Sequence, residues 1–90
     1  MLCAYLEKQQ LDGKKKKPWT KRWFVLDGNT LSYYENQKAK NCKGSYTLGK
    51  GKMSCDVEKL EFELRTDSYA RVFKAKTAKS FREWVRVSHP

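Results

Sequence analysis

The sequence has few of the side chains from which metal centres, disulfide frameworks and catalytic sites are built. Its only histidine is His89, and its three cysteines, Cys3, Cys42 and Cys55, form no Cys-x-x-Cys pair. An odd number of widely spaced cysteines favours neither a zinc site nor paired disulfides, so we expect reduced thiols and a cytoplasmic location. The chain also lacks a nucleophile–base pair and a glycine-rich phosphate loop, so we expect neither an enzyme nor a bound cofactor or metal.

Long apolar runs and acidic side chains are scarce as well. No run is long enough for a signal peptide or a membrane-spanning helix, so any contact with a bilayer is expected at its surface. Twenty Lys and Arg against ten Asp and Glu give a net charge of +10. Such an excess predicts polyanionic partners: nucleic acid, an anionic membrane or phosphorylated ligands. The densest run is Lys14–Lys17, a pattern that is equally typical of a solvated loop.

The 90 residues, of which 39% are hydrophobic and 13% aromatic, suffice for one domain over residues 1–90 with its own core. Runs of β-branched and aromatic residues with alternating polarity predict short antiparallel strands. Asp27-Gly28-Asn29 predicts a tight hairpin, and Gln9–Lys17 and Asn36–Cys42 are expected to be loops. The seven expected strands are Leu2–Lys8, Pro18–Asp27, Thr30–Glu35, Gly44–Leu48, Met53–Val57, Leu60–Thr66 and Tyr69–Ala75.

The period changes in Thr77–His89, where Ala78, Phe81, Trp84 and Val85 recur at helical spacing. Thr77 is a suitable N-cap for this helix. The expected fold is therefore mainly β, a seven-stranded antiparallel sandwich or barrel with one C-terminal amphipathic helix. Such a helix covers one end of the sheet, which leaves the opposite end open for a ligand.

The order of these segments resembles a pleckstrin homology (PH) domain over essentially the whole chain. The resembling pieces are AYLEK at 4–8, W-x-K-R-W-F-V-L at 19–26, L-x-Y-Y at 31–34, LEFELRT at 60–66, YARVFKA at 69–75 and the FREWV helix with its tryptophan. The resemblance implies a bent seven-stranded sandwich capped by the C-terminal helix. It also implies an open end formed by the loops between strands one and two, three and four, and six and seven.

In phosphoinositide-binding members of that family, basic residues and a tyrosine at the open end hold the headgroup. Carried over by position, these are Lys8, Arg22, Tyr33 and Lys43. Separately, we expect Lys16 or Lys17 to fold over the headgroup from the longer loop. Lys14 and Lys15 are expected to make non-specific contacts with the membrane. The alternation of strand Pro18–Asp27 supports a pocket role for Arg22, which shares a face with core residues, although an ordinary surface position stays open. Tyr33 fits packing at the rim as well as contact with a ligand.

One position departs from the family pattern. The first member of the basic pair in the second strand is Thr20, which offers a neutral hydrogen bond in place of a charge-assisted one. The difference forgoes about 1 kcal/mol or more of headgroup binding. Lys16 or Lys17 would compensate from the longer loop, whereas Lys21 is expected on the opposite face.

The resulting prediction is a module that binds phosphoinositides or inositol phosphates and targets a larger protein to anionic membranes. Among these membranes, the plasma membrane is the expected target. An alternative is a PH domain that docks an acidic segment of a partner protein on the same basic surface, with weak lipid binding. A basic aromatic barrel that binds nucleic acid is a third class. The C-terminal helix and the burial of most aromatic residues argue against it. We expect a monomer, and we expect Arg22→Ala to remove most of the headgroup binding.

Overall fold

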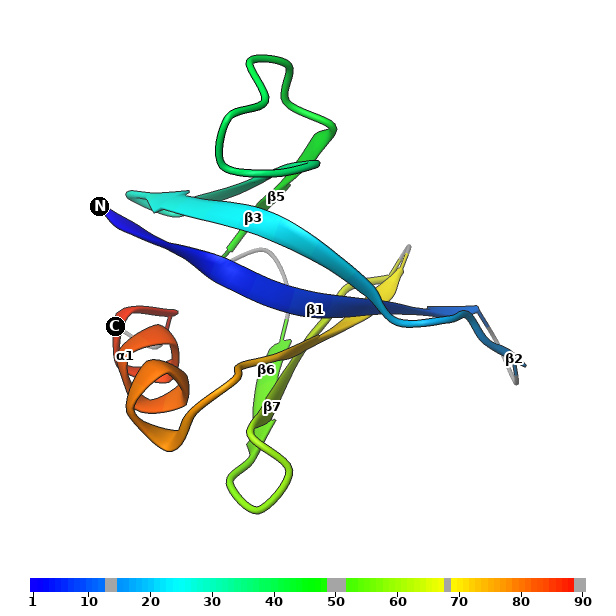
Figure 1. Cartoon of the computed structure of the whole chain (residues 1–90). Coiled ribbons are helices and arrows are strands. Elements are labelled where there is room, and N and C mark those ends of the chain that lie inside the picture. Colours follow the sequence, from blue (N-terminus) through cyan, green and yellow to red (C-terminus); the bar gives the residue numbers. More distant parts are fainter. Residues whose placement is uncertain (13–14, 49–51, 68, 89–90) are drawn as a thin grey trace.

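A computed structural model describes residues 1–12, 15–48, 52–67 and 69–88. Figure 1 shows one strongly bent antiparallel sheet with a helix at one end and a two-stranded hairpin projecting at the other. The strands run in the order β5-β4-β3-β1-β8-β7-β6, and β2 pairs with β1. The elements are β1 (Leu2–Asp12), β2 (Lys15–Lys16), β3 (Thr20–Asp27), β4 (Thr30–Tyr34), β5 (Gly44–Thr47), β6 (Lys52–Asp56), β7 (Glu61–Arg65), β8 (Ala70–Lys74) and α1 (Ala78–Ser88).

The mainly β class, the antiparallel pairing and the terminal helix are as the sequence predicts. Thr77 caps α1, since its Oγ1 accepts a hydrogen bond from the Ser80 N–H at 3.1 Å. Gly28, at a φ of 62°, opens the two-residue turn between β3 and β4, where a positive φ suits the twist of the strands. His89 lies outside the described residues, and so does Gly49-Lys50-Gly51, for which the two glycines predict a turn.

The prediction of a loop over Gln9–Lys17 is wrong. β1 continues to Asp12, and Lys15–Lys16 pairs with it in the register Leu11↔Lys16 and Asp12↔Lys15. Polar residues mislead here because a protruding hairpin has solvent on both sides and needs no alternating apolar face. The described sheet therefore has eight strands, and its basic segment is an extended hairpin.

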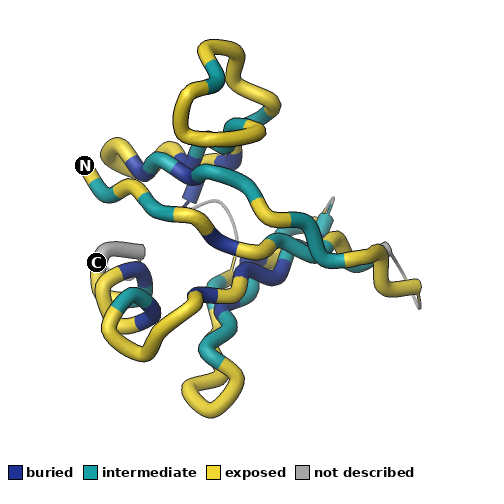
Figure 2. The backbone as a smooth tube through the Cα atoms, in the orientation of Figure 1, coloured by how far each residue is buried: buried dark blue, intermediate teal, exposed yellow. Residues whose placement is uncertain are grey.

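The core lies between the two halves of the bent sheet and against α1. Figure 2 shows buried residues in the strands and at intervals along the helix, with exposed residues between them. Phe62 and Leu64 point inward from β7, as its alternation predicts, and Trp84 is fully buried on α1. The largest buried side chains are Trp84, Phe24, Phe62, Phe73, Leu6, Leu26, Leu31 and Leu64. Because these side chains fill the inner face near α1, polar inward-facing residues are left for the part of the sheet nearer the hairpin.

No helix within the described residues is long and apolar enough to cross a membrane.

Candidate functional site

The inner face of β1, β3 and β4 carries most of the residues expected to hold a headgroup. Lys8 pairs with Thr20 and Leu6 with Arg22 across β1 and β3. Phe24 pairs with Tyr33 across β3 and β4. Because cross-strand partners share a face and alternate residues return to it, Lys8, Thr20, Arg22 and Tyr33 lie on the face that buries Leu6 and Phe24. The sheet thus brings together residues that are up to 25 positions apart.

Lys8 and Tyr33 are in direct contact. The Lys8 ammonium lies 3.8 Å from the centroid of the Tyr33 ring and 3.5 Å from the Tyr46 hydroxyl. The rings of Tyr33 and Tyr46 stack with their centroids 5.6 Å apart. A lysine held over a tyrosine ring has already lost side-chain entropy on folding, so it loses little more when a ligand binds. Lys8 is therefore oriented before any ligand arrives.

The pKa values of the two tyrosines shift in opposite directions. For Tyr33, burial raises the pKa, but the hydrogen bond and charge of Lys8, the hydrogen bond from Tyr46 and the charge of Arg71 outweigh it, so the pKa is lowered overall. For Tyr46, burial is the largest cause and, with the neighbouring Tyr33, raises the pKa to about 12. Tyr46 is only 8% exposed and contributes to the core. The field at Tyr33 is thus positive, as an anion site requires.

The sequence prediction missed Arg71, together with Tyr46 and Tyr69 that contact it. Its guanidinium carbon lies 4.9 Å from the centroid of the Tyr69 ring and 5.9 Å from that of Tyr46. Arg71 shares the face of Phe73 on β8, and Phe73 pairs with Lys8. The alternation of Arg71 with the buried Phe73 and Ala75 is a signal in the sequence that would have indicated its inward direction. We call Lys8, Tyr33, Tyr46, Tyr69 and Arg71 the basic–aromatic cluster.

A glycine makes room for this cluster. Gly44 begins β5 opposite Tyr33. A Cβ at Gly44 would lie 2.7 Å from the Tyr33 hydroxyl oxygen and 2.8–2.9 Å from two carbons of its ring. Such distances are shorter than van der Waals contact, so only glycine lets the ring lie flat over β5. The role of Gly44 is thus to position Tyr33.

The other expected site residues contact the backbone near the cluster. Arg22 is partly buried and donates from Nη1 to the Lys21 carbonyl oxygen at 2.9 Å. Thr20 Oγ1 donates to the Lys8 carbonyl oxygen at 3.4 Å, so its hydroxyl is turned toward β1. Lys43 has an exposed side chain, and its N–H donates to the Tyr33 carbonyl oxygen at 2.8 Å. The ligand roles of Arg22 and Lys43 stay predictions.

The hairpin lysines divide between two faces. Lys15 pairs with Asp12, and the Lys17 N–H donates to the Gln10 carbonyl oxygen at 3.0 Å. By register, Lys15 and Lys17 therefore fall on the side of β1 that carries Lys8, and Lys16 falls on the opposite side. All three side chains are exposed. Lys14 lies outside the described residues. The register thus puts Lys15 and Lys17 on the side of the cluster, and the roles expected of Lys15, Lys16 and Lys17 stay predictions.

Comparison with known proteins identifies the family. The family model of the PH domain matches residues 2–87. The chain belongs to the PH-domain family. The family is one of generally non-enzymatic modules that often bind phosphoinositides or proteins. The fold expected from the sequence resemblance is thereby confirmed.

Two sequence relatives give the range of proteins that carry such a domain. The chain is 34% identical over 96 residues to Src kinase-associated phosphoprotein 2 of Takifugu rubripes, covering 93% of this chain and 28% of that protein. It is 31% identical over 85 residues to Switch-associated protein 70 of Bos taurus, covering 86% of this chain and 14% of that protein. The chain thus spans less than a third of the length of either relative.

Two solved structures share the fold. The PH domain of human pleckstrin homology domain-containing protein family A member 5 is 28% identical, with a TM-score of 0.80 over 97% of this chain and 72% of that one. The C-terminal PH domain of pleckstrin is 26% identical, with a TM-score of 0.77 over 98% of this chain and 93% of that one. The pleckstrin domain was solved in complex with D-myo-Ins(1,2,3,4,5)P5.

Proposed function

We propose that this domain binds the phosphorylated headgroup of a phosphoinositide through the basic–aromatic cluster and so recruits a larger protein to anionic membranes. The observation that carries the proposal is the pair of cations, Lys8 and Arg71, held on tyrosine rings at the inner face near the lysine hairpin. An arginine donates two parallel hydrogen bonds to a phosphate, and a lysine supplies a point charge. Binding and recruitment require no catalytic step.

The surrounding residues extend this role. Arg22 and Tyr33 lie on the same face of the sheet as Lys8, and the Lys43 N–H bonds to the Tyr33 carbonyl oxygen, so we expect all three residues to contact the headgroup. Lys15 and Lys17 lie on the same side of the hairpin by register. Each lysine near an anionic leaflet contributes about 1 kcal/mol, so the hairpin adds general attraction to the more specific contacts of the cluster. The complex of pleckstrin with an inositol pentakisphosphate supports this class of ligand.

The test is co-sedimentation with liposomes of phosphatidylcholine, with and without single phosphoinositides, at two salt concentrations. Control liposomes contain phosphatidylserine in place of the phosphoinositide, in an amount that gives the same total negative charge. Binding that depends on the headgroup and survives moderate salt supports the proposal, because specific contacts are screened less than diffuse attraction. Binding that follows only total charge and fades with salt would leave only a polybasic hairpin. No binding at low salt would overturn the membrane role, and an Arg22→Ala variant is expected to lose most of the headgroup-specific part.

A further inference from the structure

A second basic surface lies on the opposite face of the sheet from the cluster. A groove of about 270 Å³ is lined by Tyr5, Leu6, Glu7, Lys21, Lys74 and Lys76. Three lysines and one glutamate give this lining a net charge of +2. Glu7 and Lys21 pair across β1 and β3, next to the Lys8–Thr20 pair of the inner face. The groove and the cluster therefore occupy the two sides of the same pair of strands.

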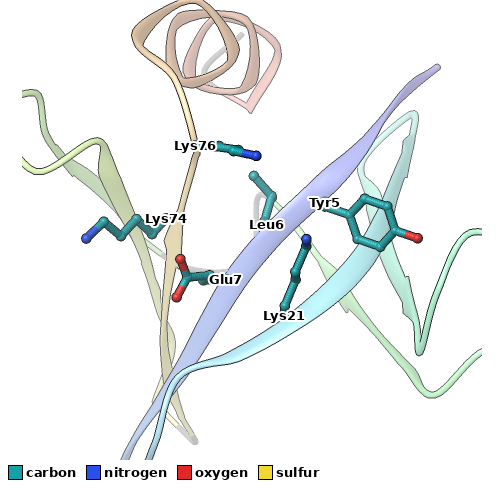
Figure 3. Close-up of a pocket in the computed structure, with 6 residues that line it drawn as sticks. All are labelled: Tyr5, Leu6, Glu7, Lys21, Lys74 and Lys76. Atoms are coloured by element: carbon teal, nitrogen blue, oxygen red, sulfur yellow. The ribbon is translucent and has the colours of Figure 1, made fainter.

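The groove exists because two segments separate. The register of β1 with β8 ends at the Glu7–Lys74 pair. Beyond it, Figure 3 shows the β1 segment with Tyr5 and the segment leading from β8 to α1 diverging on either side of the opening. In the same view, the side chains of Lys21 and Lys76 extend toward this space, whereas the ammonium group of Lys74 points away from it. Two cations from distant parts of the chain thus border one opening.

Two contacts hold the Tyr5 side chain at the wall of the groove. The Tyr5 ring meets the Trp23 ring edge-on at a centroid distance of 4.9 Å, and its hydroxyl accepts a hydrogen bond from the Gln37 N–H at 3.0 Å. The Lys21 ammonium lies 4.9 Å from the centroid of the Tyr5 ring. A tyrosine fixed on two sides therefore orients Lys21, which lowers the entropy that a ligand would otherwise have to remove.

We propose that this groove docks an acidic, extended segment of a protein partner, with a carboxylate between Lys21 and Lys76. The inference rests on the proposed membrane role only for the orientation of the domain. The positive lining matches an acidic segment by charge complementarity. The volume lies just below the range of about 300–1,000 Å³ for sites of drug-sized ligands, so it suits one side chain while the rest of the segment follows the rim.

The position of the groove favours a protein over a lipid. Glu7 precedes Asp12, at the hairpin end of β1, by five residues, or about 17 Å of strand. From Glu7 the groove extends further toward α1 (Figure 3). Lys8, which would hold the headgroup, projects from the other face of β1, so the bilayer that carries the headgroup does not face the groove. The groove remains open to solution while the cluster holds a headgroup.

The test is an NMR titration of the ¹⁵N-labelled domain, saturated with D-myo-Ins(1,2,3,4,5)P5, with an acetylated hexaglutamate peptide. By the proposed function the inositol phosphate occupies the cluster and the hairpin, so binding there is separated from binding in the groove. We expect the amide shifts to concentrate at Tyr5, Glu7, Lys21 and Lys76. A hexaglutamine peptide should shift none of them. Shifts confined to the hairpin would overturn the proposal, as would shifts at these amides with vesicles of phosphatidylserine and not with the peptide.

Variants that change the charge of the groove test which residues bind the peptide. Lys21→Ala with Lys76→Ala should weaken peptide binding about tenfold, since two ion pairs at exposed lysines are lost. Lys38→Ala with Lys59→Ala removes the same charge at exposed positions outside the groove and is the matched control. Glu7→Gln should tighten binding about two- to fivefold, because it removes a repelling carboxylate. Equal losses in the two double variants would overturn the proposal, whether or not the domain binds the inositol phosphate.

Discussion

The replacement Arg71→Ala tests the part of the site that the sequence did not suggest. Arg71 donates from Nη1 to the Ala70 carbonyl oxygen at 3.0 Å and lies against Tyr69 and Tyr46. A guanidinium has five N–H groups, so donors remain for a phosphate. A hydrogen bond to a charged group contributes about 1.5–3 kcal/mol, which corresponds to a loss of about ten- to 150-fold in affinity. Because Arg71 is only partly buried, we expect a value near the lower end, about tenfold.

The assay is isothermal titration calorimetry with D-myo-Ins(1,2,3,4,5)P5 at physiological salt. Arg82→Ala is the matched control, because Arg82 is exposed on α1 and its loss changes the net charge equally. Arg71→Lys should lose less than Arg71→Ala, since it keeps the charge without the planar donor pair. Equal affinities for the Arg71→Ala and Arg82→Ala variants would refute the reasoning. Arg71 would then only pack against the tyrosines and would not contact the ligand.

Three further results are expected. Thr20→Lys adds a cation beside Lys8 at the cost of one weak hydrogen bond, so the affinity for the inositol pentakisphosphate should rise about tenfold by calorimetry; an unchanged affinity would mean that position 20 does not face the ligand. Gly44→Ala forces the Tyr33 ring off β5 and should lower the free energy of unfolding by about 1–3 kcal/mol in urea titrations, and an unaltered midpoint would contradict the close contact. The pKa of Tyr46 is raised to about 12, so its stabilising contribution is complete below pH 10 and is lost as the pH rises toward 12. Between pH 9 and 11.5, the free energy of unfolding of the wild type should therefore fall by about 2 kcal/mol more than that of Tyr46→Phe, measured by urea titration at each pH. Parallel plots of this free energy against pH would contradict the raised pKa.

Most of the fold was predictable because local patterns and tertiary packing agree. The alternation of Leu60–Thr66 predicts the inward Phe62 and Leu64, and the period of Thr77–His89 predicts the helix that buries Trp84. The hairpin at Gly28 follows from its turn residues. The failure at Gln9–Lys17 has a physical cause. A strand that projects into solvent carries no apolar stripe, so its pairing shows only in the backbone register.

The candidate site was predictable in part. The alternation with core residues predicts an inward face for Arg22, the family resemblance indicates Lys8 and Tyr33, and the register of β1, β3 and β4 puts all three on one face. Their ligand roles stay predictions. Arg71 shows the same alternation, but on a strand whose neighbour, β1, begins more than sixty residues earlier. Its approach to the other cations therefore depends on how the sheet bends.

The sequence by itself determined the positive charge, the strand and helix content and the family, because these depend on composition and on patterns between near neighbours. The tertiary structure decided which cations meet. It stacks Lys8 on Tyr33 and Arg71 on Tyr69, and it opens a separate lysine groove beside Tyr5. The reason is geometric: contacts across a bent sheet join residues from its opposite halves, and no local pattern encodes the angle at which those halves meet.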